Sequence, residues 1–311
     1  MEQKFRTILI AILKKCRIQL ILFVLCAIAA SVSAVLGASA TALGFLSTLC
    51  LIVSGAVCFF SILFLCTADY YRKANGPRPQ GPVRPLAFLL RSVCVHLLLQ
   101  LLIAAVFLFV SFLAPYGSDF KNAADAAGDN LPLVQEIYGQ EAADAYEEQA
   151  QALSDLLEAI DQKGYTSLSF ILSVLLNIAF SYVRFVITLY AAITFGQVIK
   201  GHPVLASIAG YFALTLLGNL IILLITNLSA AVAPGIQNFA SQITSVSEMM
   251  NNLRVSSAAE FYQSLSAALP EASVYIKFIL FTNLCGVVAM VTNLIIASAL
   301  LAKKDRSIPT V

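Results

Sequence analysis

Residues 43–67 read LGFLSTLCLIVSGAVCFFSILFLCT and contain no charged side chain. An α-helix needs about 20 predominantly apolar residues to cross roughly 30 Å of hydrocarbon, because each residue adds about 1.5 Å. This run exceeds that minimum. It therefore predicts a membrane-spanning helix.

Five further apolar runs of comparable length lie on either side of it, at residues 18–36, 86–114, 168–199, 203–233 and 273–302. The chain is 59% hydrophobic and only 12% charged, whereas about a quarter of the residues in a soluble domain are charged. We therefore expect an all-α integral membrane protein, with one transmembrane domain over residues 1–311 that contains six spans.

Basic residues are concentrated in the termini and connections that lie on one side of the six predicted spans. Fourteen of the nineteen Lys and Arg residues fall in residues 1–17, in residues 67–91, at Lys200 and in residues 303–306. Six crossings place these segments on one face of the membrane, and cytoplasmic loops carry an excess of Lys and Arg. Both termini are therefore predicted to be cytoplasmic. The basic residues indicate topology and contacts with membrane lipids, and they do not indicate nucleic acid as a partner.

The other face is predicted to carry two extracellular segments, residues 115–166 and 234–272. The first holds eleven acids and two lysines, a net charge of −9. Apolar residues recur in it at helical spacing: Tyr146, Ala150, Leu153, Leu157 and Ile160. Such a stripe needs a surface to pack against, which is either the outer end of the bundle or the second segment. The second segment has a weaker apolar periodicity of its own, at Ile243, Val246, Met250 and Leu253. We expect an acidic helical cap.

The first 17 residues have an amphipathic pattern, with apolar residues at Phe5, Ile8, Leu9, Ile12 and Leu13. This predicts a helix in the inner headgroup layer; the alternative is a frayed basic tail. Residues 1–40 also imitate a secretory signal peptide. We favour retention of this segment, because residues 18–36 are long enough to span the membrane.

Motifs of soluble enzymes are missing from the sequence. It contains no P-loop and no H-E-x-x-H motif, and Asp119, Asp125 and Asp129 lack EF-hand spacing. The cysteines lie in or beside the apolar runs without metal-binding spacing, which favours packing roles: Cys16, Cys26, Cys50, Cys58, Cys66, Cys94 and Cys285. We therefore expect neither enzymatic activity nor a metal or cofactor.

Polar residues inside the spans are the better candidates for function, because each is costly there. His96 and Gln100 share a helix face at i, i+4, and Arg184 lies near the middle of residues 168–199 by count. Interhelical hydrogen bonding is the favoured role for the uncharged residues, whereas Arg184 either snorkels or faces an internal cleft. No Asp or Glu lies deep in a span, which disfavours a proton- or sodium-coupled carrier.

The most distinctive stretch is residues 190–212, YAAITFGQVIKGHPVLASIAGYF. Gly201, His202 and Pro203 end one predicted helix and start the next. Gly196, Ser207 and Gly210 offer small surfaces on which two helices can approach closely.

This stretch resembles the fourth and fifth spans of permease subunits of type-2 ABC exporters from Gram-positive bacteria. The shared features are a Tyr, an Ile-Thr-x-Gly-Gln that ends at Gln197, a short basic turn with His, and Ser-x-x-x-Tyr-Phe. The amphipathic start and the aromatic–basic end of the second span are also similar. In place of the Leu-Pro-rich loop expected after that span, this chain has a proline tract at residues 76–85.

The resemblance implies a permease subunit in the bacterial cytoplasmic membrane that works with a separate cytosolic ATPase and a second permease subunit, identical or different. The ATPase would dock on two cytoplasmic segments: Asp69, Tyr70, Tyr71 and Arg72 in one, and Lys200, Gly201, His202 and Pro203 in the other. One alternative is a non-transporting scaffold or sensor whose acidic cap binds a partner. A secondary carrier is the third possibility.

Overall fold

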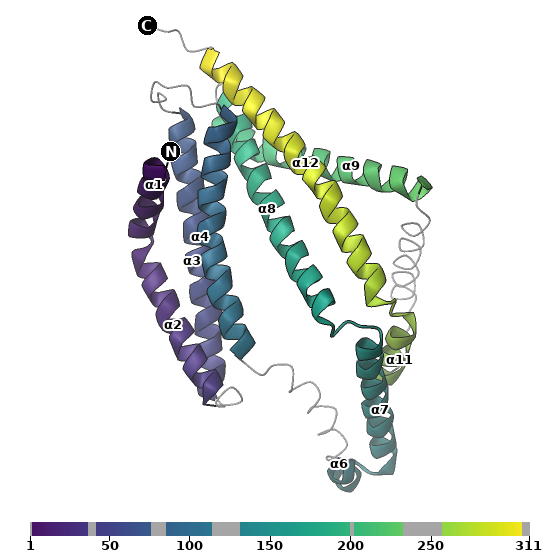
Figure 1. Ribbon diagram of the computed structural model, residues 1–311. Helices are drawn as coiled ribbons and strands as arrows, with labels where there is room; N and C mark the ends of the chain where they lie inside the picture. Colours follow the sequence, from purple (N-terminus) through teal and green to yellow (C-terminus); the bar gives the residue numbers. More distant parts are fainter. Residues whose placement is uncertain are drawn as a thin grey trace. The chain divides into compact units, whose positions relative to one another are not determined.

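The computed structural model describes residues 2–36, 42–75, 85–113, 131–199, 202–232 and 257–306, and between short turns these residues are α-helical (Figure 1). The helices are α1 (Glu2–Lys15), α2 (Arg17–Val35), α3 (Ala42–Asn75), α4 (Pro85–Leu113), α6 (Leu131–Tyr138), α7 (Gln140–Gln162), α8 (Leu168–Val198), α9 (Pro203–Val232), α11 (Ala258–Ala268) and α12 (Ala272–Arg306).

Six of these helices are long and apolar enough to cross a membrane, namely α2, α3, α4, α8, α9 and α12. The predicted all-α architecture with six candidate membrane spans is therefore confirmed for the described residues. Each of the six begins at the predicted residue or one residue before it, but α3 continues beyond residue 67 to Asn75. Asp69 forms ion pairs within α3, with Arg72 (3.3 Å) and Lys73, and such i, i+3 and i, i+4 pairs support a helix.

The chain falls into two compact units. Unit 1 comprises residues 1–115, 182–219 and 288–311, and unit 2 comprises residues 116–181 and 220–287. The boundaries cut through α8, α9 and α12, so each of these helices contributes one end to each unit.

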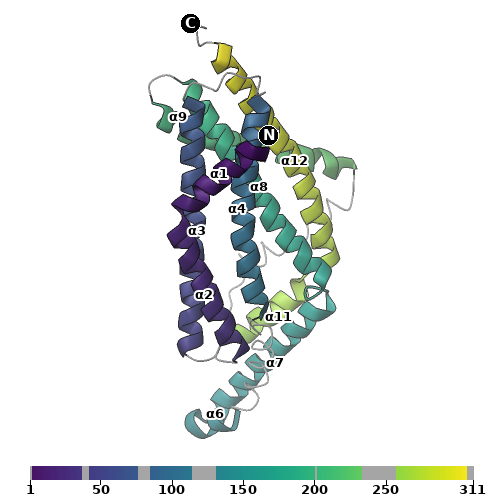
Figure 2. The same ribbon diagram turned by 60° about the vertical axis from the view of Figure 1, so that its left-hand side comes forward.

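The core of unit 1 is formed largely by α2, α3 and α4, which run beside one another (Figure 2). Phe23 of α2 lies against Gly55 of α3, where an added Cβ would stand 3.2 Å from the Phe23 ring. The N-terminal helix α1 joins this core through Ile12, which is buried. Part of the apolar face of α1 therefore packs against protein.

Several cysteines take part in packing. Cys16, Cys58 and Cys66 are buried in the core of unit 1, and Cys285 is buried in α12. Their burial agrees with the predicted packing role, because a free Cys behaves as a small hydrophobe. Cys50 and Cys94 differ, since both are exposed.

In unit 2, α7 packs against α6 and α11. The predicted apolar stripe of α7 is only half-buried along its length, and the most buried residues of the helix are instead Ala143, Ala152 and Leu156. Of the two covering surfaces considered, the second predicted extracellular segment supplies one, through α11. The predicted periodicity of that segment at residues 243–253 lies outside the described residues.

The turn after α7 is clamped to the turn that follows α11. The Lys163 ammonium donates to the carbonyl oxygens of Ser266 (2.9 Å) and Leu269 (2.5 Å), and the Tyr165 hydroxyl donates to that of Pro270 (2.8 Å). Burial, helped by Tyr275 and Glu271, raises the pKa of Tyr165 to about 12. This phenol therefore remains a donor at neutral pH. Between the two residues, Gly164 has φ +82°, a conformation that favours glycine.

Candidate functional site

Buried polar side chains from α3, α4 and α8 meet inside unit 1. We call Tyr70, His96, Tyr182, Tyr190 and Thr194 the buried polar cluster. Tyr70 has 1% of its surface exposed, and His96, Tyr190 and Thr194 have none. A buried polar group is costly unless it forms a hydrogen bond, and each member of the cluster forms at least one.

Tyr70 connects the end of α3 to the end of α8. Its hydroxyl lies 2.7 Å from Thr194 Oγ1, which itself donates to the carbonyl oxygen of Tyr190 at 2.9 Å. Because the proton of Thr194 is used in that bond, Tyr70 is the donor to Thr194. Its ring stacks on Phe88, with centroids 5.4 Å apart and planes at 22°.

Tyr70 belongs to the segment for which the sequence predicted a role in coupling to an ATPase. In the structure its ring is enclosed by Phe88 of α4 and Tyr190 of α8. Apolar contact and hydrogen bonding together stabilise an inward-facing phenol, so this side chain contacts neighbouring helices and does not form part of an exposed surface.

His96 bridges two tyrosines of α8. Its Nδ1 lies 3.2 Å from the Tyr190 hydroxyl, and its Nε2 lies 3.2 Å from the Tyr182 hydroxyl. A neutral imidazole has one donor and one acceptor nitrogen, so one tyrosine accepts from His96 and the other donates to it. The imidazole thus links the hydroxyl groups of Tyr182 and Tyr190 in a directed chain.

Gln100 lies one turn further along α4 and ties that helix to α3. Its amide nitrogen donates to the carbonyl oxygen of Phe59 at 3.0 Å. The interhelical role predicted for Gln100 agrees with this bond. Its Oε1 is buried and has no hydrogen-bond partner among the described residues.

A second polar contact lies on a different face of α8. Asn293 of α12 donates to Thr188 Oγ1 (3.0 Å), and the Thr188 hydroxyl donates to the carbonyl oxygen of Arg184 (2.8 Å). Arg184 itself is half-buried.

Within the described part of the chain, no group of three or more His, Cys, Asp or Glu side chains could hold a metal ion.

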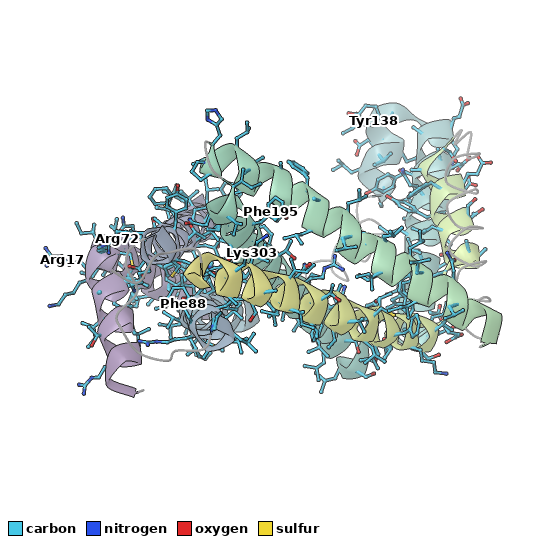
Figure 3. All side chains as sticks on the ribbon, turned by 90° about the horizontal axis from the view of Figure 1, so that it is seen from above. Arg17, Arg72, Phe88, Tyr138, Phe195 and Lys303 are labelled. Atoms are coloured by element: carbon cyan, nitrogen blue, oxygen red, sulfur yellow. The ribbon has the colours of Figure 1, made fainter. Side chains whose placement is uncertain are left out.

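The remaining docking candidates differ in exposure. The Arg72 side chain, labelled in Figure 3, is more exposed than that of Asp69. The exposed fractions are 74% and 20%. Tyr71 is half-buried, His202 is exposed and Pro203 is half-buried. Lys200 and Gly201 lie outside the described residues.

The turn between α8 and α9 brings small residues together. A Cβ on Gly196 would overlap Ser207 Oγ and the Pro203 carbonyl oxygen and would stand 2.7 Å from Ser207 N. A Cβ on Gly210 would stand 2.8 Å from the Phe195 ring. Gln197, beside Gly196, is half-buried. The start of α9 therefore approaches α8 as closely as glycine allows.

Sequence reasoning did not assign Tyr182, Thr188, Tyr190 or Thr194 to a site. Tyr182 and Tyr190 are eight residues apart, and Thr194 follows four residues later. This spacing places the three polar side chains on nearby turns of a largely apolar helix, and it is the signal that could have identified three of them.

No family model, curated protein or solved structure matches the chain.

Proposed function

We propose that this chain is the permease subunit of an ATP-driven exporter in the bacterial cytoplasmic membrane, with both termini in the cytoplasm. It would work with a separate cytosolic ATPase and a second permease subunit. The observation that carries the proposal is the buried hydrogen bond from Tyr70 to Thr194. It connects α3 and α8 at the ends that lead to the two expected docking segments.

This bond supports a mechanical role for the two segments. Arg72 is exposed at the end of α3, two residues after Tyr70, and Thr194 lies two residues before Gly196. A partner that displaces Arg72 would pull on Tyr70 and, through the hydrogen bond, on α8. Because Gly196 is in close contact with Ser207, the same movement would reach α9.

The second candidate function is a scaffold or sensor that transports nothing. Eight acids lie in α6 and α7, and all of them are exposed: Glu136, Glu141, Asp144, Glu147, Glu148, Asp155, Glu158 and Asp161. A surface of this kind suits a binding partner outside the cell. The two candidates differ in the cytosolic partner they require.

Affinity purification of the full chain from native membranes, followed by identification of the bound proteins, tests the proposal. We expect an ATPase with a P-loop to be recovered with the chain. If wild-type protein brings down no ATPase, the permease assignment fails and the scaffold becomes the leading candidate.

A charge-reversal variant makes this experiment sharper. Asp69→Lys combined with Arg72→Glu keeps an opposite-charge pair in α3, so the helix should persist. Like charges that meet across an interface weaken binding, and losing one partner of a buried charge pair commonly costs about 2–5 kcal/mol. We therefore expect ATPase recovery to fall at least about tenfold. Lys303→Glu reverses another exposed charge and should change recovery little. Equal recovery from all three proteins would argue against docking at α3.

A further inference from the structure

The helix α6 leaves an apolar face uncovered outside the predicted spans. Leu133 and Ile137 are 58% and 60% exposed, and Tyr138 is 73% exposed. Leu133 and Ile137 share one face of α6 at i, i+4 spacing. Leu131 and Val134 of the same helix are half-buried.

The position of α6 on α7 is well defined. Gly139 joins the two helices with φ +89°, which a residue with a side chain rarely adopts. Its amide donates to the Gln135 carbonyl oxygen (3.0 Å), and its own carbonyl oxygen accepts from Ala143 (3.2 Å). Figure 1 shows α6 at the end of α7 that is distant from α8.

Negative charge is concentrated in α6 and α7. Residues 131–162 contain eight acids and no Lys or Arg, and none of the eight carboxylates has an ion pair among the described residues. Glu136 lies in α6 itself. Glu141, Asp144 and Glu148 follow at i, i+3, i+7 spacing, so they share a face of the first turns of α7.

We propose that Leu133, Ile137 and Tyr138, together with Glu136, Glu141, Asp144 and Glu148, form a docking surface for a cationic amphipathic peptide segment. Exposed apolar and aromatic side chains serve as anchors in such contacts. The carboxylates attract a Lys- or Arg-rich partner and set its orientation.

The negative charge of α6 and α7 favours a peptide over the membrane as the partner of this surface. The leaflet surface of a membrane that contains acidic lipids is negative, and a segment with eight uncompensated acids is repelled from it. A cationic peptide meets the same acids favourably. The surface thus selects a basic, amphipathic ligand rather than a lipid bilayer.

Binding of a synthetic Lys–Leu peptide that forms an amphipathic helix tests this surface. The receptor is the full chain in nanodiscs of zwitterionic lipid, and the measurement is fluorescence anisotropy of the labelled peptide. We expect saturable binding that weakens as salt rises, because the carboxylates are exposed and screened. A Glu–Leu peptide of the same pattern should not bind.

Variants separate the two components of the surface. Leu133→Ser with Ile137→Ser should weaken binding at least about tenfold, and so should Glu141→Gln with Glu148→Gln. Glu271→Gln removes an exposed acid elsewhere in unit 2 and should have no effect. Tyr138→Ser provides a single-residue test should the double apolar variant fail to fold, as judged by circular dichroism.

Three results would overturn the proposal. The first is unchanged binding in all variants, and the second is equal binding of a Lys–Ser peptide, which would mean that charge alone attracts it. The third is an apolar environment for a dye at Ile137→Cys in vesicles without peptide, which would place α6 in lipid. The docking surface does not depend on the proposed ATPase partner, and the two experiments can fail separately.

Discussion

At the scale of single residues, the hydroxyl of Tyr70 has a role that can be separated from that of its ring. The ring packs on Phe88 and Tyr190, whereas the hydroxyl donates to Thr194. Thr194 keeps its bond to the Tyr190 carbonyl oxygen when Tyr70 becomes Phe, whereas its bond with the Tyr70 hydroxyl is lost.

Tyr70→Phe should therefore lower the free energy of unfolding in detergent by about 1 kcal/mol, the usual net value of one hydrogen bond. Tyr70→Ala should cost about 3–5 kcal/mol because it also leaves a cavity. Tyr71→Phe, at the half-buried neighbour, is the matched control. A double-mutant cycle with Thr194→Val that shows no coupling would contradict this assignment.

Gly196 offers a second residue-scale prediction. Gly196→Ala must push α9 away from α8, because the new methyl group would overlap Ser207 and Pro203. We expect a loss of about 1–3 kcal/mol in stability, which is typical of overpacking. Gly286→Ala is the control, since an added Cβ there meets no atom within 4 Å. Equal unfolding midpoints for the two variants would rule out the close contact.

At the scale of helices, hydropathy predicts that a helix exists and how long it is better than it predicts which face of the helix is buried. The first residues of the six long helices lie within one residue of the starts of the apolar runs, because such runs are long enough to form a continuous helix. The face of α7 was less accurate. Ala143 and Ala152 contribute little to a hydrophobic pattern, yet their small side chains are buried between helices.

The buried face of α7 can be tested with two charge changes. Leu156 is 7% exposed, so Leu156→Asp would bury an unpaired carboxylate and should destabilise the packing of α7 by about 3 kcal/mol or more. Glu147→Lys changes an exposed residue of the same helix and should alter stability by less than about 0.5 kcal/mol. The rate at which a protease cleaves α7 in the detergent-solubilised protein measures the effect of each substitution. Identical cleavage rates would mean that α7 is not packed in solution.

At the scale of the whole molecule, the pairing of residues within the buried polar cluster could not have been predicted. Its hydrogen bonds join residues 86, 94 and 124 positions apart, and periodicity within one span does not reveal which spans meet. His96 and Gln100 were recognisable as costly polar groups in a membrane helix. Their partners on α8 and α3 depend on tertiary packing, which no local pattern encodes.

Orientation is also a property of the whole chain, and it rests on the distribution of charge. The predicted topology places the acids of α7 and the basic segments on opposite sides of the membrane, so Gln149 should be extracellular and the exposed His202 cytoplasmic. Neither is a lysine, an arginine or an acid. Their replacement by cysteine should therefore leave the charge pattern that sets topology intact.

In a background in which the seven native cysteines are replaced, Gln149→Cys should react with an impermeant thiol reagent in intact cells, whereas His202→Cys should react only after permeabilisation. Both positions are exposed in the structure, so failure to react reports the membrane barrier rather than burial. Labelling of position 202 but not of position 149 from outside would reverse the orientation. The proposed ATPase-docking residues would then face away from the cytosol, and the exporter proposal would fall with the topology.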